Sequence, residues 1–404
     1  MDQDSIHSQE GQAAQDGKKE KSRRPPNTAF RQQRLKAWQP ILTPKTVLPL
    51  FFAVGVIFAP LGGLLLWASS QVQELSIQYQ HCTRDATDSF TTIPSNYVSS
   101  SFKNATTPSQ APQWRTSNQT IPYHNGAVNI DTPVCTLRFW IPDDLAPPVL
   151  LYYQLTNFYQ NHRRYVKSFD SDQLEGQFVD NSTISNSDCD PLRLDANGKA
   201  YYPCGLIANS LFNDSFVTPR LLNERNDAEP VNYTMVNKGI GWASDGDLYK
   251  KTPYTPDQVS PPPNWRVMYP EYSDTIPIPN IHDWEEFHVW MRTAGLPAFS
   301  KLALRNDTAT MRSGQYEMDI YDYFPVNVYD GTKSILLSTR TIMGGRNPFL
   351  GIAYIVVAGV CIVLGALFTA THLIRPRKLG DHTYLSWNND QPGNAINTGN
   401  AGRA

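Results

Sequence analysis

A short cluster of histidines and carboxylates is the first feature of this chain that could support chemistry. His282, Glu285, Glu286 and His288 offer nitrogen and oxygen ligands of the kind that zinc accepts. Their spacing is not that of an HExxH motif, and histidines six residues apart on a helix point in different directions. We therefore expect these side chains to lie on a helix surface and to bind no metal.

A dense polar and aromatic run, YYQLTNFYQNHRRYVKS, occupies residues 152–168. Its His162, Arg163 and Arg164 could serve acid–base or anion chemistry. No carboxylate stands beside them until Asp170. The run therefore favours structural hydrogen bonds, together with recognition of a partner or a lipid head group, over catalysis.

A glycine-rich segment, KGIGWASDGDLYK at residues 238–250, could bind phosphate or calcium. It lacks the Lys-Ser/Thr ending of a phosphate loop. Asp245 and Asp247 are spaced as in a calcium loop, but the glutamate that closes such a loop is missing. A plain turn is the better interpretation. Since no aspartyl-phosphate motif or nucleotide site occurs either, we expect a non-catalytic protein with no cofactor of its own.

Two long apolar runs organise the rest of the chain. Residues 349–373 contain no formally charged side chain and form a helix about 37 Å long, enough to cross a hydrocarbon core of about 30 Å. Residues 47–68 form a second run of sufficient length. The chain therefore divides into a basic N-terminal arm (1–46), a first span (47–68), a large middle segment (69–346), a second span (347–374) and a C-terminal tail (375–404).

Small residues recur at every fourth position in both spans, which allows two helices to approach closely. This spacing predicts helix–helix packing but does not identify the partner helix. The residues are Gly55, Ala59 and Gly63 in the first span, and Cys361, Gly365 and Thr369 in the second.

Charge, sequons and cysteines indicate one topology. Nine Lys/Arg and one acidic residue lie between Lys18 and Lys45, and Arg375, Arg377 and Lys378 follow the second span, so both termini are expected in the cytosol. Four of the five cysteines lie in the middle segment, as expected of a disulfide-bonded exoplasmic domain. All six N-x-S/T sequons lie there too, and we expect N-linked glycans on them. They begin at Asn104, Asn118, Asn181, Asn213, Asn232 and Asn306.

The middle segment has a mainly β pattern. Alternation over residues 135–141 predicts a half-buried strand, and residues 149–153, 316–320 and 334–342 are further candidates. Residues 99–129 and the proline-rich 253–279 resemble surface excursions, and the second excludes regular helix.

One helix has clear signals at both ends. Asp283 and Glu286 predict a capping box, and Gly295 with Pro297 predicts the end of the helix. Trp284, Phe287 and Met291 predict a core-facing side.

The pairing of the four cysteines cannot be deduced from their number, since three connectivities are allowed. Sequential pairing is the simplest topologically and is our prediction. It joins Cys82 to Cys135 and Cys189 to Cys204.

Long blocks of this sequence resemble the Cdc-fifty (Lem-three) family, the non-catalytic β-subunits of type-IV P-type ATPases that flip phospholipids. The similarity covers nearly everything from Asn27 to Asn388. The blocks are NTAFRQQRLKAWQP, YYQLTNFYQNHRRYVKS, YYPCG, KGIGWASDGDLYK, DWEEFHVWMRTAGLPAFSKL, GGRNPFLGIAY and RPRKLGDHTYLSWN.

The resemblance implies a membrane protein with two transmembrane helices flanking an antiparallel β-sandwich-like exoplasmic domain. It also implies the same sequential disulfides, and a heterodimer with the catalytic α-subunit of such an ATPase, to which ATP and magnesium would belong. Family members escort that subunit out of the endoplasmic reticulum and support its transport cycle, so the endoplasmic reticulum, Golgi or endosomes and plasma membrane are the expected locations.

Partner contacts are hypotheses at this stage. The basic arm meets acidic groups or lipid phosphates, although its charge also fits a plain topology signal. The candidate contact residues are Asn27, Phe30, Arg31, Gln32, Gln33, Arg34, Asn157, Phe158, Tyr159, Asn161, His162, Arg163 and Arg164.

A rival class with the same topology is a subunit of a two-span ligand-gated ion channel. A pore usually needs polar or ionisable lining residues, whereas these spans offer mostly small and apolar ones. The net charge of −2 gives no argument for nucleic-acid binding.

Overall fold

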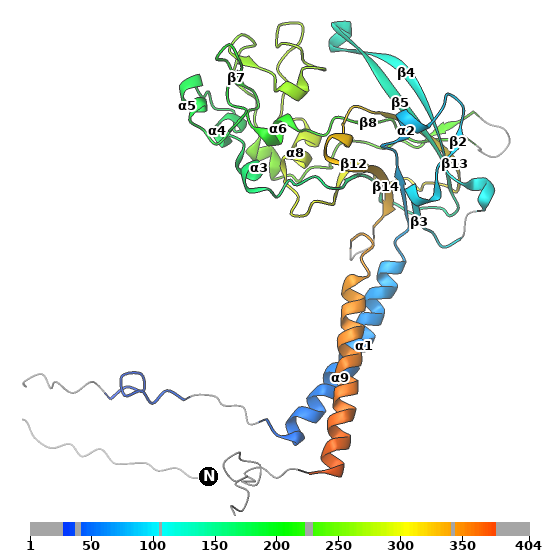
Figure 1. The fold of residues 1–404 in the computed structure, drawn as a ribbon, viewed down its shortest axis with the longest axis vertical. Helices are drawn as coiled ribbons and strands as arrows, with labels where there is room; N and C mark the ends of the chain where they lie inside the picture. Colours follow the sequence, from blue (N-terminus) through cyan, green and yellow to red (C-terminus); the bar gives the residue numbers. More distant parts are fainter. Residues whose placement is uncertain (1–26, 37–41, 105–106, 223–228, 341–343, 377–404) are drawn as a thin grey trace, which may run out of the picture. The chain divides into compact units, whose positions relative to one another are not determined.

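The computed structural model describes residues 27–36, 42–104, 107–222, 229–340 and 344–376. The chain divides into two compact units, one of Met1–Val56 with Gly359–Ala404 and one of Ile57–Ala358. Two long helices, α1 (Pro44–Ser70) and α9 (Phe349–Ile374), have residues in both units. Figure 1 shows the elements of each unit.

The second unit contains short helices as well as strands. The strands are β1 (Glu74–Gln78), β2 (Thr91–Thr92), β3 (Val98–Ser101), β4 (Gln113–Tyr123), β5 (Val128–Ile141), β6 (Val149–Leu155), β7 (Ala200–Tyr201), β8 (Ser215–Phe216), β9 (Arg220–Leu221), β10 (Val231–Asn232), β11 (Val259–Ser260), β12 (Phe299–Asn306), β13 (Gly314–Tyr321) and β14 (Lys333–Thr339). The helices are α2 (Cys82–Asp85), α3 (Arg163–Lys167), α4 (Ser171–Leu174), α5 (Asn181–Ser185), α6 (Leu206–Asn209), α7 (Asp245–Leu248) and α8 (Glu285–Met291).

Two antiparallel sheets and a parallel pair, β7 with β11, build this unit. The first has the order β12-β6-β14-β1-β3, and the second has the order β10-β9-β13-β5-β4-β2, with β8 also paired to β13. Alternate residues of both sheets, such as Ile77, Leu137 and Leu337, point into one shared core. The predicted fold class, a mainly β, sandwich-like domain between two apolar helices, is confirmed.

A second core covers one end of the first sheet. Helices α3, α4, α5, α6 and α8 lie there, on the side of the unit away from the β4–β5 hairpin (Figure 1). Trp290 and Phe287 of α8 pack in it with Tyr153 of β6, and all three are buried. Burying each such side chain contributes about 1.5–3 kcal/mol.

The predicted strands are confirmed with shifted ends. Residues 135–141, 149–153 and 316–320 lie within β5, β6 and β13. The strand predicted at 334–342 is β14, which begins at Lys333 and ends at Thr339, and residues 341 and 342 lie outside the described residues. The surface excursion predicted at 99–129 lies mostly at the surface, but it includes the regular strand β4. β4 pairs with β5 from Gln113↔Arg138 to Tyr123↔Val128. Polar residues suffice in this hairpin because its backbone ladder supplies the hydrogen bonds.

The predicted capping box of α8 is also wrong. The helix starts at Glu285 after Trp284, and no side chain caps it. Asp283 instead accepts a hydrogen bond from Asn280, 2.6 Å away. The Glu286 carboxylate accepts from Asn237 in a neighbouring loop. Tertiary partners therefore replace the local cap.

The C-terminal end of α8 and the burial of its side chains agree only in part with the prediction. The helix ends at Met291, ahead of Gly295, because Lys301 donates hydrogen bonds to its last carbonyl groups. The predicted core face is confirmed, since Phe287 and Met291 are buried and Trp284 packs against them. His288 is buried as well, contrary to the prediction of a surface position.

Two loop predictions have opposite outcomes. The plain turn predicted at Asp245 and Asp247 is the one-turn helix α7, and Asp245 is buried in an ion pair with Arg292 at 2.6 Å. The proline-rich residues 253–279 contain no regular α-helix, as predicted, and hold only β11 and a 3-10 turn at Pro263–Trp265.

The two predicted spans are α1 and α9, each long and apolar enough to cross a membrane. Pro44 is the first residue of α1. This position suits proline because the first helical residue needs no N–H partner.

Small residues do line the contact between α1 and α9, at a spacing of seven rather than four. A Cβ on Gly62 would lie 2.9 Å from the Gly351 carbonyl oxygen, and one on Gly63 would meet nothing within 4 Å. Ala59 is exposed, so two of the three residues predicted in α1 do not face α9. The buried small residues are Gly55, Gly62 and Ser69 in α1, and Gly351, Ala358 and Gly365 in α9. A seven-residue spacing is typical of helices that cross at a shallow angle.

Candidate partner-binding surface

The run at residues 152–168 leaves β6 and turns into a loop that ties two others together. Asn157 adopts a left-handed backbone with φ 58°, and its side-chain amide donates to the Tyr329 carbonyl at 2.5 Å. The Asn161 amide donates to the Gly295 carbonyl at 2.9 Å. Two predicted contact residues therefore act as braces between loops.

Phe158, also predicted to contact a partner, lies in the centre of an aromatic cluster and holds the loop in place by packing against it. Its backbone N–H donates to the Pro297 carbonyl, 3.1 Å away. Edge-on packing of this kind contributes about 0.5–1.5 kcal/mol per ring pair beyond burial. The surrounding rings are Tyr165, Trp290, Phe299, Phe324 and Tyr329.

Each of the three loops joined in this way exposes one large apolar side chain. Tyr159 is 57% exposed, Leu296 is 69% exposed and Val328 is 84% exposed. We call these three residues the three-loop surface. Apolar side chains held in the open on braced loops are typical of a protein contact.

Basic residues border the three-loop surface. His162 precedes α3, and Arg163 and Arg164 form its first turn, with all three side chains exposed. Within the described part of the chain, neither arginine forms an ion pair with an acidic side chain. These cations are free to meet an anionic group.

The other predicted contact residues lie in the exposed arm 27–36. Arg34 donates to the Asn27 side chain, and the Arg31 N–H donates to the Thr28 hydroxyl at 3.3 Å. Gln33 has a left-handed backbone with φ 54°. Phe30 is 76% exposed. The arm belongs to the first unit, and the three-loop surface belongs to the second.

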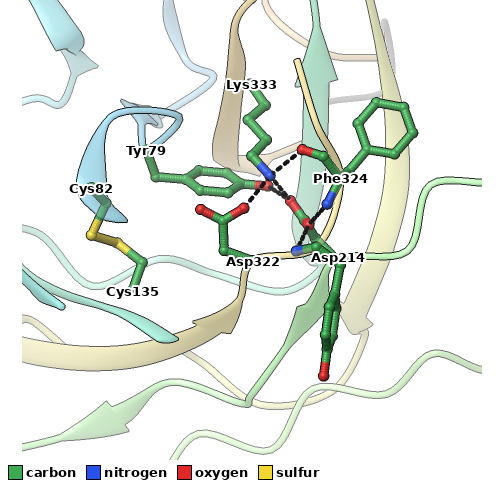
Figure 2. Close-up of polar contacts among 8 residues, drawn as sticks. Tyr79, Cys82, Cys135, Asp214, Asp322, Phe324 and Lys333 are labelled. Carbon is green, nitrogen blue, oxygen red and sulfur yellow. Dashed lines mark hydrogen bonds and ion pairs between the residues drawn. A yellow bond between two sulfur atoms is a disulfide. The ribbon is translucent and has the colours of Figure 1, made fainter. Parts of the chain in front are cut away.

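A buried polar centre holds the two sheets together (Figure 2). Lys333, the first residue of β14, donates to Asp214 at 2.7 Å, to Asp322 at 2.6 Å and to the Phe324 carbonyl at 2.7 Å. The Tyr79 hydroxyl donates to the same Asp214 carboxylate at 2.8 Å. We call this group the Lys333 centre.

Burial shapes the protonation of the Lys333 centre. It raises the pKa of Asp322, the Lys333 ammonium opposes that shift, and the neighbouring Asp214 carboxylate raises the pKa further. Burial and then the charge of Asp214 raise the pKa of Tyr79 well above its usual value. Sequence analysis missed this centre. Its signal in the sequence is a lysine directly before the strand predicted at 334–342.

Two disulfides join the pairs that sequential connectivity requires. Cys82 bonds Cys135, which ties α2 to β5 beside the Lys333 centre (Figure 2). Cys189 bonds Cys204 in the helical part of the unit.

The sequence block at 238–250 folds around an arginine. The Arg292 guanidinium lies 3.2 Å from the centre of the Trp242 ring and pairs with Asp245. Gly241 donates its N–H to Glu285 at 3.0 Å. The block therefore supports α8 rather than binding phosphate.

The histidines that could have held a metal make backbone hydrogen bonds. His282 Nδ1 lies 2.8 Å from the Tyr249 carbonyl oxygen, and His288 Nε2 lies 2.6 Å from that of Ile281. Among the residues that the structure describes, no group of three or more His, Cys, Asp or Glu could hold a metal ion.

The predicted glycosylation sites differ in exposure. Asn104, Asn118, Asn181 and Asn232 are exposed, and Asn213 and Asn306 are half-buried. The Asn306 amide donates to the Thr234 carbonyl at 2.7 Å. Their occupancy stays a prediction.

Two apolar, membrane-length helices and a disulfide-bonded β unit with braced loops define a two-helix membrane protein. The model of the LEM3 (ligand-effect modulator 3) family / CDC50 family matches residues 65–378. The chain therefore belongs to this family.

Curated relatives are similar along most of their length. The phospholipid-transporting ATPase accessory subunit CDC50 of Chaetomium thermophilum is 45% identical over 90% of this chain and 91% of its own. The accessory subunit LEM3 of Saccharomyces cerevisiae is 42% identical over 91% of this chain and 88% of its own. Cell cycle control protein 50A of Mus musculus is 37% identical over 88% of this chain and 91% of its own.

Proposed function

We propose that this chain is the non-catalytic accessory β-subunit of a phospholipid-translocating type-IV P-type ATPase. It forms a heterodimer with the catalytic α-subunit, which binds the ATP and magnesium. It supports that subunit's folding, exit from the endoplasmic reticulum and transport cycle, and so maintains phospholipid asymmetry between leaflets. The observation that carries the proposal is 45% identity to a named accessory subunit over 90% of this chain.

The three-loop surface is the proposed contact with the ATPase's exoplasmic loops. An apolar centre with a basic border fits a loop that presents apolar side chains flanked by carboxylates. Tyr159, Leu296 and Val328 supply the centre, and Arg163 and Arg164 supply the border.

Both termini are proposed to be cytosolic and residues 69–346 exoplasmic, in the endoplasmic reticulum, Golgi or endosomes, or plasma membrane. Basic residues flanking the apolar helices and six sequons between them support this topology. Glycosidase treatment is expected to increase the electrophoretic mobility of the wild-type protein. Replacing all six sequon asparagines with glutamine should abolish that change, and an unchanged wild-type mobility would contradict the topology.

Affinity purification in mild detergent tests the assembly. A near-stoichiometric P-type ATPase is expected with the wild-type protein. Val328→Ser should reduce its recovery severalfold, because the exposed apolar contact is lost. Val267→Ser is the matched control, since Val267 is 54% exposed in the proline-rich segment. Equal recovery with both variants would remove the three-loop surface from the assembly while leaving the subunit role intact.

The basic arm is proposed as a second contact, with acidic groups or lipid phosphates. Reversing the charge of Arg31 and Arg34 together should weaken assembly or ATPase turnover. Unchanged activity with unchanged topology would leave these arginines only their role in orienting the helix.

The channel alternative has a direct test in the same purification. A homo-oligomer with no ATPase, followed by ligand-gated currents, would favour it. The relatives named above are accessory subunits or cell cycle control proteins, and none of these names describes a channel.

A further inference from the structure

A groove of about 670 Å³ lies between the start of α1 and the end of α9, within the first unit. Its volume is in the range of small-molecule and cofactor sites. The lining residues are Leu42, Thr43, Pro44, Val47, Leu48, Leu367, Phe368, Thr371, His372, Ile374 and Arg375.

The lining is polarised along the helices. Leu48 and Val47 from α1 and Leu367 and Phe368 from α9 make one part apolar. Arg375 follows the end of α9 and gives the other part a permanent positive charge. None of the lining residues is acidic, so a negatively charged group meets no repulsion there.

Among the residues that the structure describes, the Arg375 side chain has no acidic partner. Its backbone N–H donates to the Thr371 carbonyl at 2.9 Å. Within the described residues, its guanidinium forms no ion pair, and no hydrogen bond from it is recorded. A guanidinium at the mouth of an apolar groove is a geometry suited to a phosphate.

The groove lies where two apolar helices reach their basic ends. In a bilayer this level is the boundary between hydrocarbon and head groups. Basic pockets between membrane helices at this level suit the head groups of anionic lipids.

We propose that this groove is a binding site for one anionic glycerophospholipid of the leaflet at the basic end of the helices. The acyl chains lie along Val47, Leu48, Leu367 and Phe368, and the phosphate is bound by Arg375. The proposal requires that the helices cross a membrane, and it does not depend on the ATPase partner.

Charge and shape together favour a lipid over the other occupants. A free phosphate would leave the apolar lining empty. The Arg375 guanidinium would remain unpaired against an apolar helix of a partner protein. An anionic phospholipid satisfies both parts of the lining at once.

Native mass spectrometry of the purified full-length protein without ATPase tests the site. The protein is exchanged into detergent containing equal amounts of phosphatidylserine and phosphatidylcholine. One tightly held phosphatidylserine per chain is expected, and Arg375→Gln should lower its preference over phosphatidylcholine about tenfold. Arg266→Gln is the control, since it removes the same guanidinium charge from an exposed position outside the groove and outside the basic arm.

A second pair of variants tests the apolar part. Leu367→Trp fills the groove and should remove both lipids. Leu373→Trp places the same ring on an exposed position of the same helix outside the groove, and should retain the phosphatidylserine. Thermal unfolding of all variants is measured first. If Leu367→Trp is misfolded, Val47→Trp replaces it as the variant that fills the groove.

Three outcomes would overturn the proposal. Equal retention of both lipids by the wild-type protein would remove the anionic preference. Equal losses in a groove variant and its control would place the lipid elsewhere on the helices. Binding of free inorganic phosphate with no lipid retained would identify an ion site instead.

Discussion

The Lys333 ammonium lies 2.7 Å from the Asp214 carboxylate, although 119 residues separate them in the chain. Their side chains are 2% and 0% exposed. Lys333 starts a strand of the first sheet, and Asp322, its other partner, follows β13 of the second sheet. The Lys333 centre therefore joins the two sheets from which the braced loops extend.

Lys333→Met is expected to destabilise the protein by about 3–5 kcal/mol, because it leaves two carboxylates buried beside each other without a counter-charge. Pulse proteolysis in increasing urea, on the full-length protein in mild detergent, measures the free energy of unfolding. Lys167→Met, an exposed control on α3, should change it by no more than about 0.5 kcal/mol.

A double variant separates lost charge from lost packing. Asp214→Asn added to Lys333→Met removes one uncompensated charge and should recover part of the lost stability. A double variant less stable than Lys333→Met would show that packing, rather than charge balance, sets the cost.

The buried Lys301 should make the stability of the folded protein depend on pH. Burial, and then the nearby Arg292, lower the pKa of this lysine to about 7. Since the unfolded chain binds the proton up to about pH 10.5, it holds more protons than the folded chain above pH 7, and stability rises with pH in that window. Wild-type stability relative to Lys301→Met should therefore rise by roughly 2 kcal/mol between pH 7 and pH 9.

The difference between the two proteins is the quantity to follow for Lys301. Lys301→Met also loses the hydrogen bonds to the carbonyl groups of Val289, Trp290 and Arg292, which shifts its stability at every pH. Parallel curves for the two proteins would mean that Lys301 stays charged throughout, held by those three carbonyl groups.

The two disulfides should contribute unequally. Cys82–Cys135 spans 53 residues and Cys189–Cys204 spans 15. In the chain-entropy model the first contributes about 4 kcal/mol and the second about 3 kcal/mol. Replacing each pair with alanines and measuring urea unfolding checks the order. A larger loss from the shorter loop would show that local structure around Cys189 outweighs loop entropy.

Gly62 and Gly63 give a matched pair of helix variants. Gly62→Val places a Cβ 2.7 Å from the Ile355 side chain and should cost about 1–3 kcal/mol of packing between α1 and α9. Gly63→Val meets open space. The temperature at which monodisperse protein is lost in detergent should be lower for Gly62→Val than for the wild type, and unchanged for Gly63→Val. Equal temperatures for the two variants would contradict the finding that Gly62, and not Gly63, faces α9.

Composition and period determined the large features of this protein. Uncharged runs of sufficient length predicted α1 and α9, alternation predicted β5, and β6, β13 and β14 were further predicted strands. These signals are local, because a strand or a membrane helix must match its surroundings residue by residue. The family resemblance added the same sequential disulfide pairing that we predicted from topological simplicity.

Tertiary structure decided which side chains do what. Both Gly62 and Gly63 are small residues in α1, and only the rotation of the helix selects Gly62. Phe158 and Tyr159 are adjacent aromatic residues, yet the first is half-buried in the second core and the second is 57% exposed.

The partners of charged side chains were the hardest feature to predict from the sequence. Glu286 fitted a local cap, yet it bonds a neighbouring loop, and Lys333 stood in the chain far from Asp214. Sequence records each residue's preference for water or for the interior, whereas a buried ion pair depends on two distant segments meeting. Only the folded chain brings such segments within hydrogen-bonding distance.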